Sequence, residues 1–401
     1  MRKYNFLLVM LVAILAISCS QSSSDTQVSN LGTKWHWDKG TIVIETPERP
    51  TGQTSVIGLK APKMEFVRVG FVGLGMRGPA AVERFTYIPG VEIVALCDYE
   101  KERAEECQKL LKKASMPEAT VYSGEKGYEE LCKRDDIDLV YIVTDWLHHT
   151  PMALYAMEHG KHVAIEVPAA MNMEEIWALI NMAEKKQLHC MMLENCVYDF
   201  FELTTLNMAQ QGVFGEILHV EGAYIHNLEE FWPYYWNNWR MDYNRKHRGD
   251  VYATHGMGPA CQLLDIHRGD KMNYLVCMDT KAVSAPEYLK NKTGEEVKDF
   301  KNGDHTITLI RTENGKTIQI QHDVVSPRPY SRMYQLTGTK GFANKYPVSG
   351  YALKPTQVSS DVAPDHENLN SHGFVPENVK KALMEKYKHP IQIELEEQAK
   401  K

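Results

Sequence analysis

The chain has 401 residues, of which 43% are hydrophobic and 24% charged. This is ordinary globular composition, and the chain is long enough for two domains. The net charge of −7 comes without long runs of like charge, whereas nucleic acid and anionic membrane surfaces bind to basic patches. We therefore expect a small-molecule or glycan substrate and no nucleic-acid partner.

The first residues resemble a bacterial lipoprotein signal. Two basic residues precede the apolar stretch Phe6–Ile17, which is too short to span a membrane as a mature helix, and the four residues that end at Cys19 resemble a lipobox. We expect a signal peptide over 1–18, export, and a lipid on Cys19 that anchors the protein at the cell envelope. An uncleaved anchor or an ordinary secretory signal is the alternative. Residues 19–63 are expected to be a tether and linker, in which 34–60 could add a strand.

A glycine motif follows the first strand-like run of the main domain. Gly73, Gly75 and Gly78 make a G-x-G-x-x-G turn, and Asp98 ends the next apolar run. In a dinucleotide-binding turn the first glycine permits a tight bend, the second lets the backbone approach a pyrophosphate, and the third lets the helix pack on the strand. A carboxylate at Asp98 can accept both ribose hydroxyls and repels a 2′-phosphate, so we expect NAD. A glycine turn without a ligand is the alternative.

Repeated strand–helix units predict a doubly wound parallel sheet, an NAD-binding Rossmann domain, over residues 64–194. The strand-like runs are VRVGFVG, VEIVALCD, LVYIVTD, HVAIEVP and HCMMLEN, and the helix-like runs are Ala80–Thr86, Lys101–Ala114, Pro151–His159 and Met173–Lys186. Asn172 and Glu175 resemble a capping box at the start of the last helix.

From residue 195 the pattern changes. The helix-like stretch Phe200–Gln211 precedes longer strand-like runs, and the hairpin signal Asn-Gly joins the last two. We expect residues 195–401 to form a substrate-binding α+β domain with an open, mostly antiparallel sheet. The strand-like runs are Ile217–His226, Tyr274–Thr280, His305–Arg311 and Thr317–Val325.

The cysteines give no metal signature. Apart from Cys19, they form no C-x-x-C pair, so no zinc site is predicted. Several lie in apolar runs, which indicates buried free thiols, although disulfides are the alternative in an exported protein. These cysteines are Cys97, Cys107, Cys132, Cys190, Cys196, Cys261 and Cys277.

Two short constellations follow strand-like runs of the first domain. Trp146 and His149 come after LVYIVTD, and Glu166-Val167-Pro168 ends HVAIEVP. Ligands of an open parallel sheet bind at the carboxyl ends of its strands, so these side chains are expected at the cofactor. A pair of histidines on a surface loop is the alternative for His148 and His149.

Two further constellations lie in the second half. Tyr252–Gly256 contains a Tyr/His pair that can move protons near neutral pH, and Arg240 precedes it by twelve residues. Aromatic side chains over 231–239 can stack on sugar rings. Arg328–Tyr330 follows a strand-like run, with a surface turn as the alternative.

At these residues the chain resembles the glucose-fructose oxidoreductase, inositol dehydrogenase and MocA superfamily, over residues 64 to about 395. Within it the chain is similar to glycoside hydrolase family 109, the NAD-dependent α-N-acetylgalactosaminidases. The shared features are Trp239-Arg240, the Tyr-x-Thr-His-Gly-x-Gly-Pro run Tyr252–Pro259, and Arg328–Tyr330. The resemblance implies a Rossmann domain and an α/β domain whose open sheet often forms dimers, so we expect a homodimer.

The resemblance also implies the site residues. The residues that would contact NAD are Met76, Arg77, Asp98, Trp146, Leu147, His148, His149, Glu166, Val167, Asn195 and Tyr252. Those that would contact the substrate are Tyr224, Arg240, Tyr252, Ala253, Thr254, His255 and Tyr330. We expect His255 with Tyr252 to transfer protons, and Tyr198 as a further acid or base.

One departure from the superfamily concerns Glu166-Val167-Pro168. The dehydrogenases commonly carry Glu-Lys-Pro there, and a valine cannot transfer the proton that net oxidation requires. The similar hydrolases share the replacement and imply a retaining, redox-neutral route: oxidation at C3 of the sugar, proton removal at C2, elimination at C1, addition of water and re-reduction. The alternatives are an NAD-dependent sugar oxidoreductase and a non-catalytic sugar- or dinucleotide-binding protein.

A second departure concerns the end of the chain. Family members usually continue past the equivalent of Ala399 into a glycine-rich His-Gly-Gly-Met-Asp-Tyr segment, whereas the sequence here ends at Lys401. The sequence is expected to be either a fragment or a naturally short form, and the missing closing segment could leave the sugar pocket incomplete.

Overall fold

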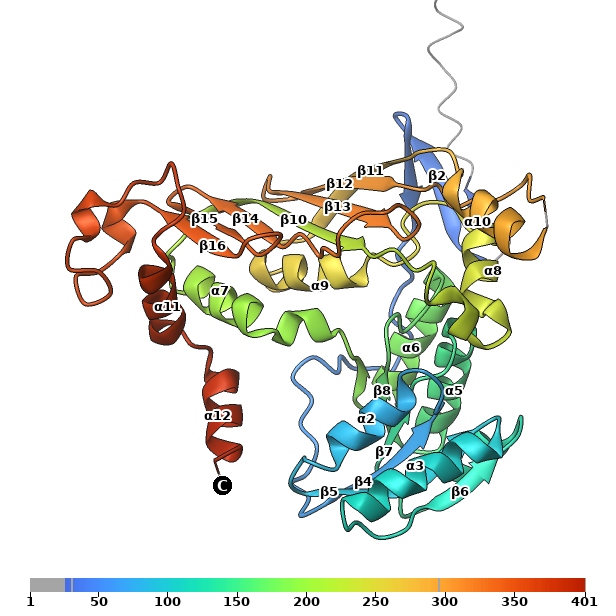
Figure 1. Ribbon diagram of the computed structural model, residues 1–401. Helices are drawn as coiled ribbons and strands as arrows, with labels where there is room; N and C mark the ends of the chain where they lie inside the picture. The colour runs from blue at the N-terminus through green and yellow to red at the C-terminus, as the bar shows by residue number, and fades with distance from the viewer. Residues whose placement is uncertain (1–25, 30–31, 295, 401) are drawn as a thin grey trace, which may run out of the picture.

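The computed structural model describes residues 26–29, 32–294 and 296–400. The expected signal peptide and Cys19 lie outside these residues. Figure 1 shows the first domain beneath one end of the long sheet of the second. In the described part of the chain, no helix combines the length and apolar character needed to cross a membrane.

The first domain contains a six-stranded parallel sheet in the order β6-β5-β4-β7-β8-β9, as predicted. Its strands are β4 (Val67–Val72), β5 (Val91–Asp98), β6 (Thr120–Ser123), β7 (Leu139–Ile142), β8 (His162–Ile165) and β9 (Cys190–Met192). Its helices are α2 (Gly78–Phe85), α3 (Lys101–Lys113), α4 (Gly127–Cys132), α5 (Trp146–Glu158) and α6 (Met173–Lys186). The sequence analysis missed β6 and α4, which are too short to show a clear period.

Neighbouring strand residues point to opposite faces of this sheet and supply two separate cores. Phe71 packs in one buried cluster with Ala81 of α2 and Leu111 of α3. Val72 belongs to the other, with residues of α4, α5 and α6 such as Ala153. Burial on both faces explains why these strands read as continuous apolar runs.

The segment before the Rossmann sheet differs from the predicted linker. It forms a three-stranded antiparallel sheet of β1 (Gln27–Val28), β2 (Lys34–Asp38) and β3 (Thr41–Ile44). The chain then docks on α6, because Arg49 forms a two-pronged ion pair with Glu184, at 2.8 and 3.0 Å. Part of the expected linker is therefore packed structure.

The second domain contains a seven-stranded sheet in the order β11-β12-β13-β10-β14-β15-β16. Only β10 and β13 pair in parallel, and the other neighbours pair antiparallel. This confirms the predicted open, mostly antiparallel sheet. Its strands are β10 (Ile217–Ile225), β11 (Met272–Asp279), β12 (Thr306–Thr312), β13 (Thr317–Asp323), β14 (Gln335–Gly338), β15 (Gly341–Asn344) and β16 (Gly350–Leu353).

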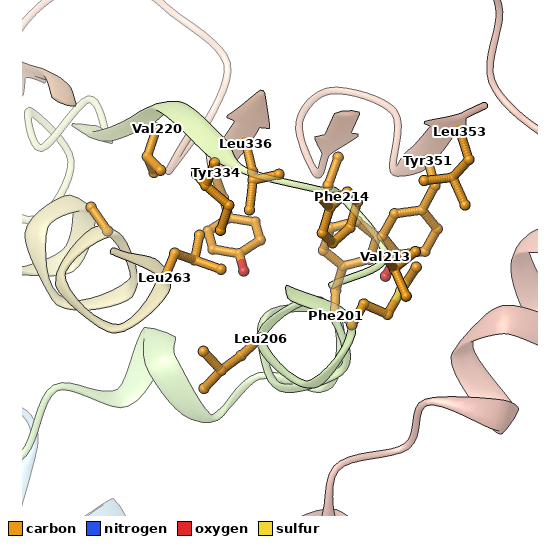
Figure 2. Packing of buried hydrophobic residues seen from close by; sticks show 14 of the residues in the cluster. Phe201, Leu206, Val213, Phe214, Val220, Leu263, Tyr334, Leu336, Tyr351 and Leu353 are labelled. Carbon is orange, nitrogen blue, oxygen red and sulfur yellow. The ribbon is translucent and has the colours of Figure 1, made fainter. Parts of the chain in front are cut away.

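Helices α7 (Phe200–Gln210) and α9 (Thr254–Leu263) cover one face of this sheet. Figure 2 shows the core between them, where Phe201 stacks on Tyr351 with ring centroids 5.0 Å apart. At the far end of the sheet Figure 1 shows α11 (Glu377–Lys386) and α12 (Pro390–Gln398). Helices α8 (Trp239–Lys246) and α10 (Ser284–Thr293) lie at the end near the first domain.

Two facing glycines set the position of α9. A Cβ on Gly222 of β10 would lie 2.6 Å from the Cα of Gly256, and a Cβ on Gly256 would lie 2.8 Å from the backbone nitrogen of Ala223. Real side chains do not tolerate such distances, so helix and strand touch through bare backbone. This close contact fixes His255, which precedes the helix glycine.

The seven cysteines within the described residues are free thiols. Cys97, Cys107 and Cys132 are buried, in keeping with the prediction, and Cys190 is half-buried. Cys277 is exposed instead, because β11 is the edge strand of the second sheet and solvent reaches both of its faces.

Candidate active site

A cleft of about 1220 Å³ runs between the two domains. The first domain lines it with the carboxyl ends of β4, β5 and β7 and the residues that follow β8. The second domain contributes residues of β10, the segment 228–240, Tyr252, His255 and Arg332. The cleft therefore joins the glycine motif to the Tyr/His pair, which lie far apart in sequence.

The glycine turn has the shape that a dinucleotide requires. Gly73 has a φ of +95°, and a Cβ there would lie 2.7 Å from the backbone nitrogen of Thr144. A Cβ on Gly78 would collide with the carbonyl oxygen of Gly73. At Gly75 the nearest atom to a Cβ is Nη1 of Arg103, 3.6 Å away. The middle glycine is thus open to the cleft, where a pyrophosphate can approach the backbone.

Asp98 is held at the second strand end by the turn itself. Its Oδ2 accepts a hydrogen bond from the backbone nitrogen of Leu74 at 2.6 Å, and its Oδ1 accepts one from Glu100 at 3.0 Å. Arg103 lies 3.5 Å away on the same side. The carboxylate lines the cleft in a fixed orientation and keeps lone pairs that can accept ribose hydroxyls.

Glu166 and Val167 both line the cleft. The Tyr141 hydroxyl donates to Glu166 Oε1 at 3.0 Å, and the Arg77 guanidinium lies 3.8 Å from the same oxygen. Val167 is buried, and its carbonyl oxygen accepts a hydrogen bond from the Tyr252 hydroxyl at 3.3 Å. This bond ties the Tyr/His segment of the second domain to the first domain.

The two neighbouring histidines of α5 occupy different environments. His149 is buried, with Nδ1 2.7 Å from the Pro168 carbonyl oxygen. His148 is exposed and contacts Asp145 at 2.7 Å. The hydrogen bond to Asp145 raises the pKa of His148, whereas burial lowers the pKa of His149. Both lie on helix α5, not on a surface loop, and both line the cleft.

His255 forms a buried pair with Glu194, a residue that the sequence analysis did not select. Its Nδ1 lies 2.7 Å from Oε2 and 2.8 Å from Oε1 of the carboxylate. Burial lowers the pKa of His255, although the hydrogen bond to Glu194 opposes this. The neutral ring then donates from Nδ1 to the carboxylate, and Nε2 keeps a lone pair for proton transfer.

Cys196 completes a group of three around this pair. Its Sγ lies 3.5 Å from His255 Nδ1, and the ligand-type atoms of Glu194, Cys196 and His255 lie within 4.8 Å of one another. The donor types are ones that zinc accepts. Burial raises the pKa of the Cys196 thiol to about 12, and His255 with Glu194 forms a base with its orienting carboxylate.

Arg240 lies at the centre of the aromatic part of the cleft. Its guanidinium carbon is 4.8 Å from the ring centres of Trp146 and Tyr252, and it donates to the hydroxyls of Tyr235 at 2.8 Å and Tyr224 at 3.2 Å. Trp146 stacks on Tyr252 with centroids 5.1 Å apart. One buried cation therefore joins side chains of both domains.

Aromatic side chains also meet across the cleft near Asp98. The ring of Tyr99, in the first domain, lies 5.5 Å from that of Trp236, in the aromatic segment of the second. Asn237 and Asn238 follow with φ values of 50° and 52°. This left-handed backbone is uncommon for residues other than glycine.

The cleft gathers most of the residues that the sequence analysis selected, and their roles stay predictions. Those that line it are Gly73, Gly75, Met76, Arg77, Asp98, Trp146, His148, His149, Glu166, Val167, Asn195, Tyr224, Arg240, Tyr252 and His255. Those outside its lining are Gly78, Leu147, Tyr198, Ala253, Thr254 and Tyr330. Leu147 and Tyr198 are exposed, and Tyr330 contacts the lining residue Arg332 through a 2.7 Å hydrogen bond.

Glu194 and Arg332 are the main site residues that sequence reasoning missed. Glu194 had a usable signal, because it follows a strand-like run just as Glu166 does. Arg332 had none beyond its place two residues after Tyr330.

Two family models match this chain, one over each domain. The model described as "Oxidoreductase family, NAD-binding Rossmann fold" matches residues 67–194. The open turn at Gly75 and the fixed carboxylate at Asp98 fit the same cofactor. The molecule therefore belongs to the class of enzymes that bind NAD in a Rossmann domain.

The match to the second domain identifies the enzyme family. The model "Glycosyl hydrolase 109, C-terminal domain" matches residues 198–401, half of the chain. The chain belongs to glycosyl hydrolase family 109, and this confirms the resemblance found in the sequence.

Curated relatives carry the same family name. Glycosyl hydrolase family 109 protein 1 of Bacteroides fragilis is 72% identical over 361 residues, which cover 89% of this chain and 78% of the relative. The protein of the same name from Bacteroides thetaiotaomicron is 71% identical, covering 90% of this chain and 77% of the relative. A family 109 protein from Porphyromonas gingivalis is 70% identical with the same coverage.

Solved structures show the same fold at low identity. Myo-inositol dehydrogenase from Lactobacillus casei, in complex with NAD(H) and myo-inositol, matches with a TM-score of 0.53 and 20% identity, covering 70% of this chain and 74% of that one. UDP-N-acetylglucosamine 3-dehydrogenase from Acidithiobacillus ferrooxidans matches with a TM-score of 0.50 and 18% identity, with the same coverage.

The two glycines of the turn predict different effects of an added methyl group. Gly78→Ala should lower the melting temperature of the NAD-free protein, because its Cβ collides with the Gly73 carbonyl. Gly75→Ala should leave that temperature nearly unchanged and weaken NAD binding, by about tenfold or more, because its Cβ points into the open cradle. Thermal unfolding and calorimetric titration with NAD check both. Equal effects of the two substitutions would contradict this assignment.

Proposed function

We propose that the chain is a retaining glycosidase that acts on terminal α-linked N-acetylgalactosamine or a related glycoside. Its route would be oxidation at C3 of the sugar, elimination, addition of water and re-reduction. The observation that carries the proposal is the pair of His255 and Glu194, which presents an oriented base to a cleft that also contains the NAD motif.

Different residues of the cleft would carry out the different steps of this route. When bound, NAD would accept a hydride from C3 of the sugar and later return it. His255 Nε2 would take a proton from the sugar, and Glu194 would stabilise the imidazolium that results. The Tyr252 hydroxyl, held by the Val167 carbonyl, lies beside His255 with ring centroids 5.0 Å apart and would share the proton transfers. Tyr198 is exposed outside the cleft lining, so it would act only if the substrate reaches beyond that lining.

Val167 supports a route without net oxidation. Its buried side chain packs with Tyr224 and Tyr252 in an apolar cluster and offers no proton-carrying group at this position. The lysine that the superfamily's dehydrogenases commonly place there is missing. A redox-neutral cycle needs no exchange of NADH between turnovers, which suits an enzyme outside the cytoplasm.

The direct test is turnover of an aryl α-N-acetylgalactosaminide in heavy water, without added NAD, by the purified protein. We expect release of the aryl group and deuterium at C2 of the sugar product, because proton removal at C2 precedes elimination. His255→Ala should abolish both. Formation of NADH from free sugars, without glycoside cleavage, would instead identify a sugar oxidoreductase. Cleavage without deuterium at C2 would refute the elimination route.

The His255 pair also predicts a pH dependence. Burial lowers the pKa of His255. The midpoint of the acid limb in the pH profile of kcat/KM should therefore lie below the ordinary histidine pKa of about 6.5. Glu194→Gln removes the charge that raises this pKa, so the limb should move to still lower pH while kcat/KM at neutral pH falls, on the order of 10²-fold. Glu216→Gln, at an exposed position, is the matched control. An unchanged profile in Glu194→Gln would exclude Glu194 as the orienting group.

We also propose that the protein is an exported lipoprotein of the cell envelope. The support is the apolar stretch Phe6–Ile17 followed by the lipobox-like sequence that ends at Cys19. Metabolic labelling with palmitate should mark the wild-type protein in the membrane fraction, and Cys19→Ala should remove the label. Labelling that persists in Cys19→Ala would contradict the proposal.

A further inference from the structure

The cleft wall of the second domain carries an uncompensated positive charge. Among the described residues that line the cleft from residue 195 onward, Arg240 and Arg332 are the cations, and none is Asp or Glu. Both guanidinium groups lie against the ring of Tyr224, with centroid distances of 5.5 Å for Arg240 and 4.3 Å for Arg332. The chain as a whole has a net charge of −7, so the charge of this wall is opposite in sign to that of the chain.

Within the described residues, the side chains of these two arginines donate hydrogen bonds only to neutral groups. Their side-chain hydrogen bonds end on tyrosine hydroxyls, from Arg240 to Tyr235 and Tyr224 and from Arg332 to Tyr330. Arg240 Nε and Arg332 Nη1 are buried and have no hydrogen-bond partner in this part of the chain. Burying a guanidinium without an anion is costly, which indicates that a ligand supplies the missing charge.

The neighbouring histidines neither add to nor cancel this charge. Burial lowers the pKa of His226 and of His255, and the positive charge of Arg332 lowers both further. Burial, with a contribution from Arg240, lowers the pKa of His322 to about 3. The three rings are therefore neutral at neutral pH, and the negative charge of Glu194 is directed at His255.

The cofactor is not the natural partner of Arg332. The pyrophosphate cradle is the glycine turn on the opposite wall, where Arg77 and Arg103 line the cleft. Arg240 contacts Trp146 of the first domain, but the ring contacts of Arg332 are with Tyr224 and Tyr330 of the second. Arg332 thus belongs to the substrate end of the cleft.

We propose that Arg332, together with Arg240, forms a subsite for an anionic substituent of the sugar, either a sulfate ester or a carboxylate. This rests on the proposed glycosidase function. The planar guanidinium fork matches both groups, because each presents two oxygens at the spacing of paired N–H donors. The substrate class is therefore acidic α-glycosides, and C3 must carry a free hydroxyl for the oxidation.

Paired substrates test the subsite. We would compare kcat/KM for an aryl α-N-acetylgalactosaminide, its 6-sulfate and 4-sulfate, and an aryl α-galacturonide, which separates sulfate from carboxylate. The wild-type enzyme should prefer at least one anionic substrate over the neutral one, by about tenfold or more, the effect of one charge-assisted hydrogen bond. Arg332→Gln should remove the preference, and Arg332→Lys should restore part of it. Arg268→Gln removes the same charge from an exposed turn and should leave the preference unchanged.

Two results would overturn the subsite: a wild-type enzyme that does not prefer any anionic substrate, or an Arg332→Gln variant that loses activity equally on neutral and acidic substrates. Binding of the free sugars separates this outcome from failure of the proposed function. If no glycoside is cleaved, calorimetric titration of the NAD-loaded protein with galacturonic acid, N-acetylgalactosamine and its 6-sulfate and 4-sulfate still decides. Tighter binding of an acid that Arg332→Gln abolishes supports the subsite, and equal binding of acid and neutral sugar refutes it.

Discussion

The guanidinium of Arg240 is the contact on which the geometry of the cleft depends. It touches Trp146 from the first domain and Tyr252 and Tyr224 from the second. Because the cation is buried among aromatic faces, moving any one ring exposes charge and apolar surface together. The two domains therefore share one core at the site, and the position of the substrate wall relative to the cofactor wall is fixed by packing.

Each wall arises from a separate structural rule. In the first domain, the carboxyl ends of the parallel strands lie at one edge of the sheet, and Asp98, Trp146 and Glu166 lie at that edge. In the second, bare backbone contact between Gly222 and Gly256 presses α9 onto β10 and places His255 beside Tyr224, with ring centroids 5.6 Å apart. The chemistry needs both, since the first wall holds the cofactor and the second presents the base.

The sequence predicted what depends on local pattern. The glycine turn, the strand ends and the Asn172 cap, which accepts from the Glu175 backbone at 2.9 Å, follow from spacing and period alone. Glu194 was missed because its importance comes from pairing with a residue 61 positions away. The strand allowed for residues 34–60 is present as β2 and β3, whereas β1 was missed because two residues show no period. Family resemblance, rather than pattern, selected Tyr224.

The contact between Tyr99 and Trp236 has a consequence for the cofactor. Both rings line the cleft next to Asp98, at the sheet edge where the adenosine half of a dinucleotide lies in a Rossmann domain. The cofactor end of the cleft is therefore bounded by side chains of both domains. A change in the arrangement of the two domains would alter the wall around the cofactor as well as the wall around the substrate.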